Sequence, residues 1–210
     1  MEAIVQYFDH FGWVEAIDLA GLVLGLVYLW LEFKASIWLW LASVIMPIVH
    51  GYLYWERGLY ADFGMEVYYV LAAVYGYAVW RWSGSHASSG REKPAERAIS
   101  RFPSRQVLPT VLVCLVLWGA IYWILVTFTD SNVPVCDSFT TSLSMVAMWA
   151  LAQKYAEQWL LWFVVDLVCT VLYIYKQIPF TACLYGFYTV MSILGYRQWL
   201  RKMVTSRSGD

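Results

Sequence analysis

Long apolar runs separated by short polar segments divide this chain into a regular series of elements. Each run approaches the ~20 mostly apolar residues that an α-helix needs to cross the hydrocarbon core of a bilayer. Backbone polar groups in lipid must be bonded internally, so helices are expected for these runs, and their continuous apolar character argues against alternating barrel strands. The pattern predicts seven spans, at residues 14–32, 36–55, 63–82, 108–128, 137–153, 158–176 and 179–199.

The distribution of basic residues predicts the orientation of these spans. Cytoplasmic loops of membrane proteins are enriched in Lys and Arg, and the only long polar segment, residues 83–107, is basic. With that loop in the cytoplasm, all but two of the 14 Lys and Arg residues lie inside, and only Arg57 and Lys176 lie outside. We therefore predict an external N terminus and a cytoplasmic C terminus, with residues 1–13 as an interfacial segment and residues 200–210 as a basic cytoplasmic tail.

Composition supports a membrane protein and excludes several other classes. Hydrophobic residues make up 61% of the 210 positions and charged residues 14%, whereas soluble domains carry about 25% charged residues. The net charge of -1 offers no basic surface for nucleic acid. His10, His50 and His86 are far apart, and no nucleophile elbow, phosphate-binding loop or metal-ligand pattern accompanies them. We expect no enzymatic activity, no metal, no cofactor and no nucleic-acid partner.

An internal repeat organises the spans. The sequence Gly76-Tyr77-Ala78-Val79-Trp80 ends the third span, and Gly195-Tyr196-Arg197-Gln198-Trp199 ends the seventh; Trp40 and Trp162 align upstream. Residues 14–82 and 137–199 are therefore predicted to be two copies of one three-helix unit, and the connector helix 108–128 makes the copies parallel. The alternative is that both motifs are only aromatic anchors at the membrane interface. In that interpretation Trp80, Trp199, Trp38 and Tyr60 are interfacial aromatic residues.

The repeat predicts where a ligand binds. Transporters built from repeats hold their substrate near the midplane between the two halves. Residues three, four and seven apart share a helix face, and several faces here combine acids, aromatic rings and hydroxyls. The candidate substrate-binding residues are Trp40, Glu66, Tyr69, Thr141, Ser144, Trp159, Trp162, Asp166, Tyr188 and Ser192.

Buried charge in the spans is acidic, and this indicates the kind of ligand. Asp166 lies about 12 Å along its helix from Gln158, at 1.5 Å per residue, and hence near the midplane. Carboxylates beside aromatic faces suit a flat, cationic heteroaromatic compound and disfavour a phosphorylated one. Two alternatives remain: Asp166 forms a hydrogen bond between helices, and Glu66 is a solvated residue at the outer interface.

Two runs carry a resemblance to a known family. Leu59-Tyr60-Ala61-Asp62-Phe63-Gly64-Met65-Glu66, continuing to Gly76-Tyr77 and Trp80, resembles the first-repeat signature of the PnuC family of vitamin transporters. Glu157-Gln158-Trp159-Leu160-Leu161-Trp162, continuing to Asp166, resembles the second-repeat signature. The resemblance extends from about residue 14 to 202.

The resemblance implies an all-α fold of seven transmembrane helices in a 3+1+3 arrangement, like an enlarged SWEET sugar transporter. It further implies facilitated diffusion of an unphosphorylated B-vitamin compound across the bacterial inner membrane, followed by trapping by a cytoplasmic kinase. Known members form trimers, and Trp159 and Trp162 match the aromatic pair at the family's substrate site. Nicotinamide riboside is the expected substrate. A related branch carries thiamine, and other members are expected to carry riboflavin.

One position departs from the family pattern. Carriers of nicotinamide riboside tend to have Gln where this chain has Glu66. A carboxylate offers no amide donor for reading a carboxamide, so this difference favours thiamine, the alternative substrate. A sugar permease of similar topology and a membrane-integral enzyme are more distant alternatives.

Overall fold

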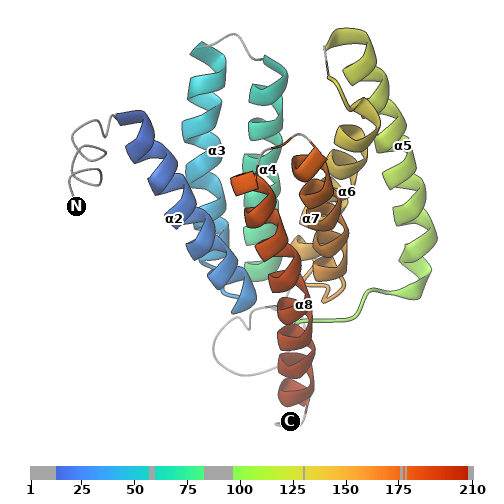
Figure 1. The fold of residues 1–210 in the computed structure, drawn as a ribbon. Helices are drawn as coiled ribbons and strands as arrows, with labels where there is room; N and C mark the ends of the chain where they lie inside the picture. Colours follow the sequence, from blue (N-terminus) through green and yellow to red (C-terminus); the bar gives the residue numbers. More distant parts are fainter. Residues whose placement is uncertain are drawn as a thin grey trace. The chain divides into compact units, whose positions relative to one another are not determined.

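A computed structural model describes residues 13–56, 60–82, 97–129, 131–175, 177 and 179–207. Within these residues the chain forms seven helices (Figure 1). Their bounds are α2 Trp13–Phe33, α3 Leu39–Glu56, α4 Tyr60–Trp82, α5 Ser104–Phe128, α6 Pro134–Ala152, α7 Gln158–Tyr175 and α8 Pro179–Arg207. Each predicted span is confirmed as a helix. Nearly all of the predicted interfacial segment, and residues 83–96 of the predicted loop, lie outside the described residues.

Two helices extend four residues or more beyond the predicted spans. α5 begins at Ser104, directly after Pro103, whose backbone is extended (φ -68°, ψ 127°). α8 continues to Arg207 and projects beyond the start of α7 (Figure 1). Leu, Arg, Lys and Met are strong helix formers, and basic side chains near a helix C terminus interact favourably with its dipole. Most of the predicted tail is therefore helical.

Membrane-spanning character is clearest in the second half of the chain. Among the described residues, three helices combine the length and hydropathy of a span: Ser104–Phe128, Pro134–Ala152 and Gln158–Tyr175, with mean hydropathies of 2.4, 1.2 and 1.6. α5 has no buried residue. Most of its apolar side chains are exposed, as is expected of a helix in contact with lipid.

The chain divides into two compact units, residues 1–74 and 75–210, with the boundary inside α4. In the first unit, α2 packs against α3. In the second, α7 packs most extensively against α8, and α6 packs against both α5 and α7 (Figure 1). The predicted 3+1+3 division and the repeat boundaries 14–82 and 137–199 stay predictions.

A short segment, residues 97–103, forms hydrogen bonds with the turn between α6 and α7. We call this segment the strap. The backbone N–H of Ser100 donates to the carbonyl of Lys154, and the N–H of Ala156 donates back to Ser100, both at 3.0 Å. Glu157 accepts a hydrogen bond from the N–H of Phe102 at 2.7 Å and pairs with Arg101 at 3.1 Å. The turn from α6 to α7 is thereby held in place, and α7 starts from a fixed point.

Candidate substrate-binding site

Four polar or aromatic side chains lie on one side of α7, and the helix is buried where it begins. Gln158 and Trp159 begin the helix, and Trp162 and Asp166 follow at helical spacing. Gln158 is 0% exposed, Trp159 1% and Asp166 6%. Residues four apart on a helix are neighbours, so Gln158 lies next to Trp162, and Trp162 next to Asp166. The predicted grouping of Trp159, Trp162 and Asp166 on one face follows directly from this spacing.

α8 runs antiparallel beside α7 and supplies the partners of this face. The Ser192 hydroxyl donates to Asp166 Oδ2 at 3.3 Å. Towards the other end, Tyr173 stacks on Tyr185 with ring centroids 5.2 Å apart and 22° between planes. Tyr188 meets Tyr185 edge-on at 6.0 Å. The structure thus brings together the predicted residues Asp166 and Ser192. It also places Tyr188 in a group of three tyrosines, with Tyr185 and Tyr173, on the same two helices.

Four polar atoms on α7 are buried and have no hydrogen-bond partner among the described residues. They are both amide atoms of Gln158 and the indole Nε1 atoms of Trp159 and Trp162. Leaving a buried polar group unpaired costs about 1–3 kcal/mol, and native proteins leave few such groups. Their concentration within two helical turns marks the place where a ligand with matching donors and acceptors would be stabilised.

Gln158 was missed by the sequence-based prediction of the site. Its type and position offered a signal, because it precedes Trp159 and lies one helical turn before Trp162. Sequence spacing did not reveal that its carboxamide is completely buried. A buried primary amide offers two donors and one acceptor oxygen, which is suited to reading a polar edge of a heteroaromatic ligand.

Asp166 also fulfils the alternative interpretation given above. Its bond to Ser192 is a hydrogen bond between helices, so that interpretation is confirmed. Asp166 has no ion-pair partner among the described residues. A buried carboxylate without a basic partner is costly in a membrane. A cationic ligand on the same face would offset that cost.

The other predicted residues lie on three further helices. Thr141 and Ser144, on α6, are half-buried. Trp40 on α3 is buried, and Glu66 and Tyr69 on α4 are half-buried. The last three belong to the first compact unit. The contribution of all five to a binding site stays a prediction.

The interpretation of Trp80 and Trp199 as interfacial anchors is wrong. Both indoles are fully buried. Trp80 Nε1 donates to the carbonyls of Leu151 and Ala152, at 3.2 and 3.1 Å. Its ring lies against the ammonium of Lys154, 4.0 Å from the centroid. The two equivalent tryptophans of the predicted repeats are core residues, and their rings meet at 6.5 Å.

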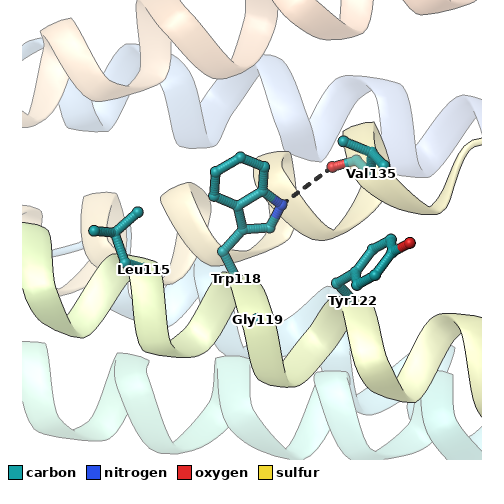
Figure 2. Close-up of a pocket in the computed structure, with 5 residues that line it drawn as sticks. All are labelled: Leu115, Trp118, Gly119, Tyr122 and Val135. Carbon is teal, nitrogen blue, oxygen red and sulfur yellow. Dashed lines mark hydrogen bonds between the residues drawn. The ribbon is translucent and has the colours of Figure 1, made fainter.

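A cavity of about 260 Å³ lies elsewhere, between α5 and the start of α6, and is drawn in Figure 2. Its lining consists of Leu115, Trp118, Gly119, Tyr122 and Val135. The Trp118 indole donates to the Val135 carbonyl at 3.3 Å and to Ser138 Oγ at 3.1 Å. This indole nitrogen is satisfied within the protein, in contrast to those of Trp159 and Trp162. The cavity includes none of the predicted site residues.

Comparison with known proteins identifies the family to which this chain is similar. Residues 15–201 match the family described as nicotinamide mononucleotide transporter. The nicotinamide riboside transporter PnuC of Escherichia coli is 24% identical, over 90% of this chain and 85% of its own. The riboflavin/roseoflavin transporter RibM of Streptomyces davaonensis is 28% identical, over 98% of this chain and 93% of its own.

A solved structure has the same fold. The crystal structure of the vitamin B3 transporter PnuC superposes with a TM-score of 0.67 and 24% sequence identity, covering 97% of this chain and 87% of that one. This agreement supports the helical membrane fold, and the matched relatives are transporters rather than enzymes. The chain is a multi-pass membrane protein and belongs to the PnuC family of vitamin transporters.

Proposed function

We propose that this protein carries an unphosphorylated, cationic B-vitamin compound across the membrane, with nicotinamide riboside as the first candidate. The observation that carries the proposal is the face of α7. There the polar atoms of Gln158, Trp159 and Trp162 that have no partner among the described residues share a side of the helix with the Asp166 carboxylate, which lies about two turns after Gln158. A pyridinium ring suits indole faces through cation–π and stacking contacts. The carboxamide of nicotinamide riboside complements the Gln158 amide, and the positive charge of its pyridinium ring complements Asp166.

The same chemistry argues against a phosphorylated substrate. A mononucleotide brings a phosphate into a site whose ionisable residue on α7 is an acid. Two negative charges in a low-dielectric environment repel one another strongly. We therefore propose that the unphosphorylated nucleoside is the transported form, although the family description refers to the mononucleotide.

Riboflavin is the second candidate. The riboflavin/roseoflavin transporter RibM is 28% identical, against 24% for the Escherichia coli PnuC. An isoalloxazine ring is flat enough for two indoles, and its imide edge has donors and acceptors for a glutamine amide. It lacks the positive charge that Asp166 favours. Thiamine, suggested by Glu66, stays a prediction from the sequence.

The proposed transport mode is facilitated diffusion. Two parallel three-helix repeats, 14–82 and 137–199, would rock about the site and open it to each side in turn. Trapping by a cytoplasmic kinase removes the need for an ion gradient. We place the protein in the bacterial inner membrane, with the N terminus outside and the C terminus inside, as a homotrimer.

Binding and uptake by the purified protein test this function. We expect isothermal titration in detergent to show saturable binding of nicotinamide riboside, but not of nicotinamide mononucleotide. In proteoliposomes without ion gradients, labelled nicotinamide riboside should enter until its internal and external concentrations are equal. Riboflavin and thiamine are measured in parallel, and preferential binding of either would replace nicotinamide riboside as the substrate.

A matched pair of variants locates the site. Trp162→Ala removes an indole of the α7 face and should weaken binding at least about tenfold, because a cation over a desolvated indole contributes about 2 kcal/mol or more. Trp123→Ala removes a tryptophan that is 61% exposed on α5, and binding should be unchanged. Failure of the wild-type protein to bind or carry any of the three vitamins would refute the proposal.

A further inference from the structure

At Gly195 the α8 backbone closely approaches the side chain of Trp159 on α7. A Cβ atom at this position would be 2.6 Å from Cδ2, 2.6 Å from Cε2 and 2.7 Å from Cε3 of Trp159. Cδ2 and Cε2 form the rigid junction of the two indole rings and Cε3 is bonded to that junction, so the contact is not with a flexible end of the side chain. Only glycine lets the indole lie directly against the helix at this separation.

Trp199 contacts the same indole, and Trp80 in turn contacts Trp199. Trp199, one helical turn after Gly195, meets Trp159 edge-on, with centroids 6.0 Å apart and 84° between planes. Trp80 meets Trp199 at 6.5 Å. Edge-to-face contacts of this kind favour one relative orientation of the rings. The three indoles therefore form a row from the end of α4 to the start of α7.

The far end of the row is fixed by polar contacts. The Trp80 indole bonds to the carbonyls of Leu151 and Ala152, at the last turn of α6. The buried Lys154 ammonium lies over its ring. In contrast, the Trp159 indole nitrogen has no partner among the described residues. The row is therefore held in place by hydrogen bonds at Trp80, and at Trp159 it has an indole N–H with no partner among the described residues.

From this geometry we propose that Gly195 is a positioning residue: it seats the Trp159 indole against α8, and Trp199 and Trp80 fix its angle for the ligand. The inference rests on the function proposed above. It gives the repeated Gly-Tyr-x-x-Trp motif of residues 195–199 a defined role, in which the glycine and the tryptophan both contact a single binding-site ring.

A double-mutant cycle tests the seat. Gly195→Ala should displace the indole and weaken nicotinamide riboside binding at least about tenfold by isothermal titration. It should also lower the thermal unfolding midpoint. In a Trp159→Leu background the clash is absent, and alanine is the stronger helix former, so the same change should raise the midpoint. This reversal of sign is the coupling that a direct contact produces.

Gly119→Ala is the matched control, because Gly119 is also inside a helix and nothing lies within 4 Å of an added Cβ. It should leave binding unchanged and the midpoint equal or higher. The inference is overturned if Gly195→Ala shifts the midpoint in the same direction in both backgrounds, or if it leaves wild-type binding intact. If the wild-type protein binds none of the three vitamins, the proposed function fails, and the midpoint cycle alone decides whether Gly195 and Trp159 are coupled.

Discussion

Gln158 has a side chain whose burial lowers the stability of the ligand-free protein and which is suited to binding a ligand. Its side chain is completely buried at the start of α7, and neither amide atom has a partner among the described residues. A residue selected only for folding would be apolar here, since replacing an unsatisfied polar group with an apolar group of similar shape is neutral or stabilising. The amide is therefore best explained by a ligand that bonds to it.

This argument predicts the behaviour of Gln158→Met. The thioether has a similar shape and no strong donor, so the ligand-free protein should gain about 1–3 kcal/mol of stability. Thermal unfolding in detergent should show a higher midpoint, while titration should show vitamin affinity reduced about tenfold or more. Gln198→Met, at a half-exposed position on α8, is the control and should change neither quantity substantially. A variant with a lower midpoint would contradict the explanation.

At the scale of elements, the strap determines how α7 begins. Glu157 combines two contacts of unequal value. Its bond to the Phe102 N–H is short and charge-assisted, a type that contributes about 1.5–3 kcal/mol. Its ion pair is with Arg101, whose side chain is 55% exposed, and exposed pairs contribute roughly 0–1 kcal/mol. Arg101 also donates to the Tyr196 hydroxyl at 3.1 Å, linking the strap to α8.

Two substitutions at Glu157 separate these contacts. Glu157→Gln keeps a neutral acceptor for the Phe102 N–H but loses the ion pair and the charge assistance of that bond, so it should cost roughly 1 kcal/mol. Glu157→Ala loses both contacts and should cost about 2 kcal/mol or more. Thermal unfolding of both variants gives the comparison, with Arg105→Ala as an exposed-cation control. Equal losses for Gln and Ala would show that the ion pair, rather than the backbone bond, stabilises the turn.

At the scale of the whole molecule, the charge distribution predicts its orientation in the membrane. All but two of the Lys and Arg residues are assigned to one side, and such a bias sets topology during insertion. The connection between α5 and α6 is then external, and the end of α8 is cytoplasmic.

Reporter fusions test this orientation. Alkaline phosphatase fused after Ser131 should be active, because that position is predicted to be external. The same enzyme fused after Arg207 should be inactive, while green fluorescent protein fused there should fluoresce. Because the two reporters are active on opposite sides of the membrane, each serves as the control for the other. The reverse pattern would invert the predicted topology.

The helices and the α7 face were determined by the sequence alone, because both depend on local physics. Continuous apolar runs become helices in lipid, since no other backbone partner is available there. Once the helix is accepted, the spacing of Trp159, Trp162 and Asp166 places them on one face. The family was likewise recognisable from short motifs in each half of the chain.

The contacts between helices were decided only by the tertiary structure. The sequence did not show that Asp166 would meet Ser192 or that Trp80 would be buried against Lys154. Nor did it show that Gln158 would have no hydrogen-bond partner in the part of the chain that the structure describes. In a membrane protein, a face towards lipid and a face towards another helix are both apolar. Hydrophobic periodicity therefore does not set the rotation of a helix, and only packing determines which tryptophan anchors the core and which is presented to a ligand.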